Sequence, residues 1–429
     1  MRRHMSWFAI ALLLVLGSGC GRQVLTTQPA TDTADIARTD PVMESRASHG
    51  RGAAQVIGST CSGALFALYR PDQWKGDLVL YAHGFTQPTD AIHLPPIEGL
   101  RDQLLAQGVA VGYSSFAENG LAIRDGIRQT ERLEDLFADR LGHPRRVFLI
   151  GTSMGGVIAV ALAEKHPDRY AGVLTVSGLI GGTRGLVEYI AHVRVLFDVY
   201  YPGVLQGDLF HIPPGLDLNQ HVVGPAVAAM SAHPQGAAII SQLVQSPVPF
   251  ASGPELVGSM VQALALHFIE LNDLLHRTGG ESFFDNANVA YSGALPAPVL
   301  ADLNARVARF TSTADVQEFL DDWYEPTGRL EIPMVTLFNQ RDPVVNGFNE
   351  TRYAARVAAH GHADLLVQHS FARYGHSELF TPEEIAQAFA ELAARAASAR
   401  HHDDDDHHDG DSDRAVAARG AGAAAGAGW

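Results

Sequence analysis

The stretch VFLIGTSMGG, from Val147 to Gly156, is the part of the sequence that most constrains the fold. Four apolar residues suited to a buried strand lead into the pattern Gly-x-Ser-x-Gly, and a helix-forming segment follows at once. A strand that turns sharply into a helix around such a serine is a nucleophile elbow. Gly151 and Gly155 fit this turn, because a Cβ atom at either position would collide with the neighbouring strand and helix. Ser153 is therefore the candidate nucleophile.

Strand and helix patterns alternate on both sides of this stretch. An antiparallel pair is expected at 54–60 and 63–71, followed by an apolar strand at 78–85 that is typical of a sheet buried on both faces. Further along the chain we expect helices at 96–107, 122–141 and 157–166 and strands at 109–116 and 172–176. This order predicts an α/β fold with a doubly wound, mostly parallel sheet.

The alternation is interrupted once, which divides the domain into two parts in sequence. Residues 180–330 contain helix-like stretches separated by Pro and Gly, and they predict a mainly helical cap. A strand pattern resumes at Ile332, followed by a helix at 348–360, a strand at 363–370 and a last helix at 382–399. The expected core therefore comprises residues 54–179 and 331–399.

Both ends of the chain differ in composition from this core. Residues 1–20 carry Arg2, Arg3 and a short apolar run, which predicts an export signal that is too short to span a membrane. Small residues before Cys20 resemble the lipobox of bacterial lipoproteins, so this cysteine is a candidate lipidation site. Residues 21–53 predict a flexible tether, and the His/Asp and Ala/Gly tail at 400–429 predicts disorder. We therefore expect an exported protein, either lipid-anchored to the membrane or periplasmic or extracellular.

Charge and cysteine content narrow the possible partners. The net charge is −16, of which about −5 lies in the tail, so the folded part is mildly acidic and no nucleic-acid partner is expected. Cys20 and Cys61 are the two cysteines. If Cys20 is acylated, Cys61 is a free thiol, and otherwise the two could form a disulfide; we favour a small core residue for Cys61.

A serine hydroxyl needs a base within hydrogen-bond reach and an acid behind that base. His376 lies in a glycine-containing loop between the last strand and the last helix, whereas His369 and His362 lie inside that strand or before it. Asp342 follows an apolar strand and precedes a proline, while the alternative Asp364 begins a strand. The expected triad is therefore Ser153, Asp342 and His376.

The carbonyl under attack also needs donors for its developing negative charge. The backbone N–H of Met154, directly after the nucleophile, is one candidate. The second is the N–H of Phe85, because the neighbouring Gly84 lets the main chain approach closely. We expect His83 to brace this loop rather than to titrate in catalysis.

Taken together, the motifs AHGF at 82–85, GTSMG at 151–155, Asp342 and YGH at 374–376 resemble the α/β-hydrolase superfamily. The resemblance covers about residues 60–180 and 332–398. It implies acyl transfer through an acyl-enzyme, and a cap domain inserted after the sixth core strand, where residues 180–330 lie. The stretch SSFAENGLAIRDGI also resembles secreted esterase and prolyl-oligopeptidase-like members.

Three functions remain open at this point. The first is an exported carboxylic ester hydrolase that uses the serine triad and no cofactor or metal. The second is a peptidase of the prolyl-aminopeptidase or oligopeptidase kind, for which the cap offers Glu270, Asp273, Glu281 and Asp285 but no evident acidic pair. The third is a non-catalytic surface binding protein that kept the fold. The expected substrate is a small-molecule or polymeric ester.

Overall fold

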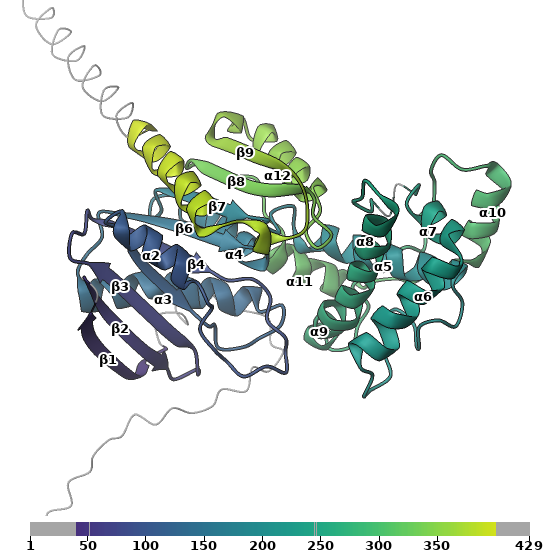
Figure 1. Ribbon diagram of the computed structural model, residues 1–429, viewed down its shortest axis with the longest axis horizontal. Coiled ribbons are helices and arrows are strands. Elements are labelled where there is room, and N and C mark those ends of the chain that lie inside the picture. The colour runs from purple at the N-terminus through teal and green to yellow at the C-terminus, as the bar shows by residue number, and fades with distance from the viewer. Residues whose placement is uncertain (1–39, 51, 244, 246, 400–429) are drawn as a thin grey trace, which may run out of the picture.

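The computed structural model describes residues 40–50, 52–243, 245 and 247–399 (Figure 1). The predicted export signal, Cys20, the first part of the tether and the C-terminal tail lie outside these residues. Nine strands of the described chain form one sheet in the order β1-β2-β3-β5-β4-β6-β7-β8-β9. Their bounds are β1 Val42–Gly50, β2 Ala53–Thr60, β3 Leu65–Pro71, β4 Asp77–Ala82, β5 Ala110–Ser114, β6 Arg146–Thr152, β7 Gly172–Val176, β8 Met334–Arg341 and β9 Leu366–Tyr374.

The sheet is mostly parallel, and the predicted fold class is confirmed. Strands β5, β4, β6, β7, β8 and β9 pair in parallel, while β1, β2 and β3 extend the sheet by antiparallel pairing. The parallel strands have their carboxyl ends at one edge, where residues from different loops can meet. This strand order, with a sharp strand-to-helix turn after the central β6, is that of the α/β-hydrolase fold.

Helices cover both faces of the sheet, which explains why its central strands are apolar on both sides. In β6, Val147 and Leu149 pack on one face, and Phe148 and Ile150 on the other. The first face is covered by α3 Ile123–Leu141, α4 Met154–Lys165 and α12 Phe348–Ala359, and the second by α2 Glu98–Ala106 and a helix over residues 382–399. The apolar stripe predicted for residues 122–141 is the buried side of α3.

The tether prediction was wrong for its last part, because Val42–Gly50 forms the edge strand β1. This strand pairs with β2 along most of its length, although its side chains are largely exposed. Backbone pairing with a neighbouring strand holds it, so an apolar pattern is not required. Cys61 follows β2 in a turn, is half-buried and is not a free thiol, which differs from the core residue that we favoured.

The segment between β7 and β8 is helical, and we refer to residues 180–330 as the insertion (Figure 1). Its helices are α5 Thr183–Tyr200, η1 Asn219–Val223, α6 Gly224–Ala232, α7 Pro234–Ile240, α8 Gly253–Leu266, η2 His267–Leu271, α9 Asn272–Arg277, α10 Ala297–Arg306 and α11 Ala314–Tyr324. Within the described ranges, no helix is long and apolar enough to cross a membrane.

A buried carboxyl group in α12 gives a prediction for folding stability. Glu350 accepts hydrogen bonds from Thr336 (2.8 Å) and Gln368 (2.7 Å), and burial raises its pKa from 4.5 to about 7. Because the native carboxyl keeps its proton to higher pH than the unfolded one, its contribution to stability is complete below pH 4.5 and is lost as the pH rises to 7. The loss is on the order of 3 kcal/mol.

Glu350→Gln keeps an acceptor for both hydrogen bonds and cannot ionise, so we expect the variant to lose less stability between pH 5 and pH 8 than the wild type. Denaturant unfolding at the two pH values measures the difference. An equal loss in both proteins would contradict the prediction.

Candidate active site

Ser153 occupies a strained turn between β6 and α4, as the sequence predicts. Its backbone angles are φ 55° and ψ −122°, a conformation that non-glycine residues rarely adopt. The turn is fixed on both sides, because the Ser153 N–H donates to the carbonyl of Val176 (3.0 Å) and its carbonyl accepts from the N–H of Leu179 (2.9 Å). The hydroxyl is therefore presented at the carboxyl edge of the sheet.

The glycines around the serine are required by close backbone contacts. A Cβ atom on Gly155 would lie 2.0 Å from the carbonyl oxygen of Ala82, and one on Gly151 would lie 2.1 Å from the carbonyl oxygen of Gly155. Real Cβ atoms do not approach other atoms so closely. The first turn of α4 thus packs directly on the end of β4.

We expect Gly155→Ala to destabilise the protein by about 3 kcal/mol, because the added methyl group must displace backbone rather than a flexible side chain. Gly253→Ala is the matched control, since a Cβ atom at Gly253 meets nothing within 4 Å. Thermal unfolding of the two variants and the wild type tests the comparison. Equal stability of both variants would show that the elbow tolerates a side chain at residue 155.

The predicted base and acid form a hydrogen-bonded pair. His376 Nδ1 donates to Asp342 Oδ2 at 2.7 Å, and the other carboxylate oxygen accepts the N–H groups of Val344 (2.9 Å) and Val345 (3.0 Å). Asp342 is fully buried. Since the proton on Nδ1 is engaged by the carboxylate, Nε2 is the nitrogen left to accept a proton.

Nε2 of His376 is buried and has no hydrogen-bond partner among the described residues. The same part of the chain contains no hydrogen bond between this nitrogen and the Ser153 hydroxyl. Catalytic hydrogen bonds of this kind often tighten only when substrate is bound. The loops after β6, β8 and β9 bring Ser153, Asp342 and His376 to the same edge of the sheet.

The rival residues are occupied elsewhere. His369 lies within β9 and forms an ion-pair contact with Glu391 at 2.8 Å. Asp364 lies exposed in the short helix η3 Ala363–Leu365, and His362 precedes that helix. None of these three makes a hydrogen bond to His376 or Asp342 in the described chain.

A residue that the sequence reasoning missed holds the histidine loop. Asn339, fully buried in β8, donates from Nδ2 to the carbonyls of Gly375 (2.9 Å) and His376 (3.2 Å). The sequence gives little signal for this role, because β8 ends in three polar residues, Asn339, Gln340 and Arg341. Asn339 positions the backbone of the base from the strand that also carries the acid.

The loop after β4, which carries Gly84 and Phe85, approaches Ser153 closely, as expected from the sequence. A Cβ atom on Gly84 would lie 3.1 Å from Ser153 Cβ and 3.6 Å from its Oγ, so the loop after β4 touches Ser153. Phe85 follows in this loop and is half-buried, and Met154 is the first residue of α4. Their N–H groups remain the predicted oxyanion donors.

His83 braces this loop. Its Nδ1 donates to the carbonyl of Gly84 at 2.7 Å, and its ring stacks on Phe116 with centroids 3.9 Å apart. Burial lowers the pKa of His83, so the ring stays neutral at pH 7. The position therefore fits support of the loop.

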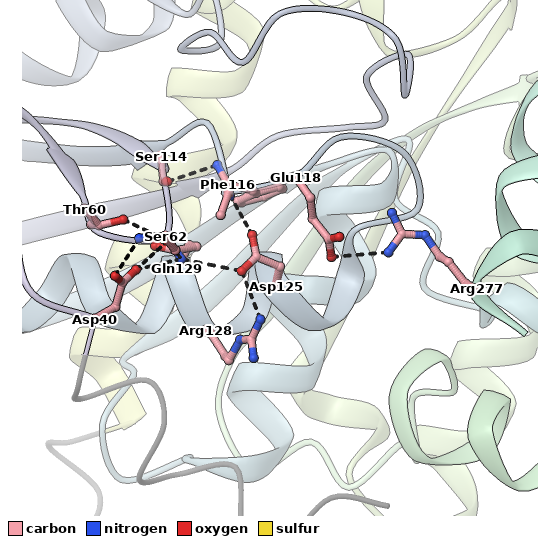
Figure 2. A network of polar contacts seen from close by, with 11 residues as sticks. Asp40, Thr60, Ser62, Ser114, Phe116, Glu118, Asp125, Arg128, Gln129 and Arg277 are labelled. Carbon is pink, nitrogen blue, oxygen red and sulfur yellow. Dashed lines mark hydrogen bonds and ion pairs between the residues drawn. The ribbon is translucent and has the colours of Figure 1, made fainter. Parts of the chain in front are cut away.

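Phe116 itself adopts a positive φ of 58° in the turn after β5. Figure 2 shows the contacts that hold it: the Phe116 N–H donates to Ser114 Oγ (3.0 Å), and the next N–H, of Ala117, donates to Asp125 Oδ2 (2.6 Å). Asp125 is buried and also pairs with Arg128 at 3.1 Å. This network supports the oxyanion loop from behind, through the stacked His83 ring.

The insertion is fastened to the loops of the core near this site. Arg277 of α9 pairs with Glu118 (3.2 Å), as Figure 2 shows, and Asp273 Oδ2 accepts the N–H of Leu121 (2.7 Å). On the other side, Glu255 of α8 pairs with Arg341 (3.1 Å) at the end of β8. The described residues contain no group of three or more His, Cys, Asp or Glu side chains that could hold a metal ion.

The fold and the site together define an α/β-hydrolase-fold protein with a serine at the nucleophile elbow. Residues 130–206, which include the elbow, match the family model Esterase, described as "putative esterase". By fold and by this match, the chain is similar to esterase-type hydrolases. No curated protein matches the sequence.

Several solved esterase and lipase structures are similar to the chain. An esterase of Pyrococcus furiosus has 13% identity and a TM-score of 0.40, covering 87% of this chain and 99% of its own. Lipase A of Candida antarctica has 15% identity and a TM-score of 0.42, with 84% of each chain covered. An esterase from Aspergillus oryzae has 12% identity and a TM-score of 0.40, covering 76% of this chain and 73% of its own.

Proposed function

We propose that this protein is an exported serine hydrolase that cleaves carboxylic esters through an acyl-enzyme on Ser153. The observation that carries the proposal is the Asp342–His376 pair, whose free Nε2 lies at the sheet edge where the elbow presents Ser153. The match of residues 130–206 to an esterase family model supports the ester as substrate.

In the proposed reaction, the Ser153 hydroxyl gives its proton to Nε2 of His376 while Oγ bonds to the ester carbonyl carbon. The N–H groups of Phe85 and Met154 stabilise the oxyanion of the tetrahedral intermediate, and Asp342 stabilises the imidazolium. When the intermediate collapses, the C–O bond to the alcohol breaks and the imidazolium protonates the leaving oxygen. Water then repeats the sequence on the acyl-enzyme, which releases the acid and regenerates the serine.

A peptidase of the prolyl-aminopeptidase kind is the second candidate. Parallel assays of p-nitrophenyl esters and p-nitroanilides of the same acyl groups separate the two, because a peptidase turns over the amides at a rate comparable with the esters. We expect ester hydrolysis to dominate. Amide turnover equal to or above ester turnover would replace the esterase proposal by the peptidase one. Absence of both, with no labelling by a fluorophosphonate, would leave the non-catalytic binding protein.

Export is a proposal that rests on the N-terminal sequence. Cell fractionation of the native host, with mass measurement of the mature N-terminus, distinguishes its two forms. A lipid-anchored protein starts at an acylated Cys20, stays with the membrane and leaves Cys61 as a free thiol, which is not its state in the structure. A secreted protein is cleaved and soluble. A full-length chain that remains in the cytoplasm would contradict both.

A further inference from the structure

One helical run of the insertion crosses the carboxyl edge of the sheet. It consists of α8, η2 and α9, residues 253–277, and Figure 1 shows α8 and α9 beside the ends of the strands. At one end, Ser259 Oγ lies 3.3 Å from the hydroxyl of Tyr374, two residues before His376. At the other end, Asp273 binds the N–H of Leu121 in the loop after β5. The run is therefore anchored over β9 and near β5, on either side of the elbow.

The dimensions place Glu270 over the centre of the sheet. From Ser259 to Asp273 a helix rises about 21 Å, and the strands β9 and β5 are about 24 Å apart across the sheet. Glu270 lies about 16 Å along this path from Ser259. That position falls over the central strands of the sheet, which include β6 with Ser153.

The side chain of Glu270 is largely enclosed, and its carboxyl group has no hydrogen-bond or ion-pair partner among the described residues. Its residue is 6% exposed, and it makes no hydrogen bond or ion pair with any described side chain or backbone group. The charged and titratable groups that act on it are His376, from the loop after β9, and Asp273, on its own helical run. Asp273 already pairs with Arg277 at 2.8 Å, and no Lys or Arg of the described residues forms an ion pair with Glu270.

A buried carboxyl without a partner costs free energy, and such a group persists at functional sites where a ligand supplies the missing partner. The π-helical turn η2 that carries Glu270 is a local irregularity of the kind that often occurs at functional sites. The charge of His376 opposes the rise in the pKa of Glu270, which is consistent with the two groups facing the same site.

We propose that Glu270 is the counter-ion for a positively charged substrate group, so that the site selects esters that carry an ammonium group near the scissile bond. This inference rests on the proposed function and deepens it by naming the substrate class. A carboxylate in a site with few competing waters attracts a cation more strongly than one in bulk water.

The same arrangement predicts a pH dependence. Burial raises the pKa of Glu270 to about 7; the positive charge of His376 opposes this rise, and the negative charge of Asp273 adds to it. A cation binds the ionised carboxylate, so affinity for the cation should rise as the pH increases through 7 and fall below it.

Binding is measured without turnover, which keeps this test separate from the ester hydrolase proposal. The unfolding temperatures of wild type, Glu270→Gln and Glu318→Gln are measured with choline or propylammonium at constant ionic strength. The neutral alcohols 3,3-dimethylbutanol and propanol are the controls for choline and propylammonium, respectively. Glu318 is an exposed carboxylate of α11 and provides the matched change of charge. We expect at least one cation to stabilise wild type and Glu318→Gln at pH 8, and neither to stabilise Glu270→Gln. No shift in the wild type, or equal shifts in all three proteins, would overturn the proposal.

Hydrolysis then assigns the cation to one side of the ester. Choline and 3,3-dimethylbutyl esters differ in charge on the alcohol side, and alanyl and propionyl p-nitrophenyl esters differ on the acyl side. In one pair we expect the cationic ester to have the higher kcat/KM, and Glu270→Gln to reduce that preference about tenfold, a change of about 1.4 kcal/mol. If the protein hydrolyses the neutral and the cationic ester of each pair with equal kcat/KM, the cation site is rejected and the esterase proposal stays intact. Failure of all ester turnover would reject the esterase proposal, and the binding measurement would still decide on the cation.

Discussion

Replacing Ser153 with alanine is expected to lower kcat for p-nitrophenyl ester hydrolysis by roughly 10⁶-fold. The variant loses the only atom that forms the proposed covalent bond, and the remaining pair of Asp342 and His376 cannot substitute for it. Removal of the serine from other serine hydrolases has effects of this size, and the low activity that remains comes from the oxyanion donors and from substrate binding. Initial rates at saturating ester, with active-site concentration taken from titration of the wild type, give the comparison.

Ser370→Ala is the matched control for this measurement. Ser370 is an exposed serine of β9, and its hydroxyl contacts only the amide of Gln340 at 3.3 Å among the described groups. We expect this variant to keep wild-type activity. Activity of Ser153→Ala within tenfold of wild type would show that another residue is the nucleophile.

Replacing Asp342 with asparagine is expected to lower kcat by about 10⁴-fold with little change in KM. The amide of asparagine cannot hold the imidazole with its proton on Nδ1 as the carboxylate does, and it carries no charge to stabilise the imidazolium. The backbone N–H groups of Val344 and Val345 can still bind the amide oxygen, so the loop should keep its shape.

The control for this variant is Asp302→Asn, because Asp302 is an exposed carboxylate of α10 paired with Arg306 at 2.9 Å. Equal melting temperatures and normal activity in the control would assign the loss to the acid of the triad. A drop of less than tenfold in Asp342→Asn would indicate that His376 is oriented by other contacts, with the amide of Asn339 as the first to examine.

The sequence was sufficient to predict the central sheet because its strands are buried on both faces. Residues 147–150 are apolar without interruption, and the glycines that follow are needed at backbone contacts near 2 Å, so both features leave a clear pattern. Asp342 and His376 could be chosen because each follows a strand at the carboxyl edge. Their hydrogen bond is the geometric result that this reasoning anticipated.

Other features could not be predicted because they depend on pairing in three dimensions. Strand β1 is exposed and polar, and only its backbone ladder with β2 orders it. Asn339 resembles any polar residue at the end of a strand until the carbonyls of the histidine loop are seen beside it. Glu270 was one of four acidic residues considered for the cap, and burial without a partner is what distinguishes it.

The helical run that carries Glu270 connects the insertion to the proposed triad. Its anchors are Tyr374, the last residue of β9 before the loop of His376, and Leu121, in the loop after β5. A change of substrate preference can therefore arise in the insertion without any change at Ser153, which is how one fold serves many substrates.

The most direct test of the central proposal is to trap the covalent intermediate. Wild-type protein is mixed with a slowly hydrolysed p-nitrophenyl ester, quenched in acid within the first turnover, digested and analysed by mass spectrometry. We expect the acyl mass on the peptide that contains Ser153, with loss of the adduct in Ser153→Ala. An acyl group on a different residue, or turnover of the ester with no covalent adduct at any quench time, would contradict the proposal.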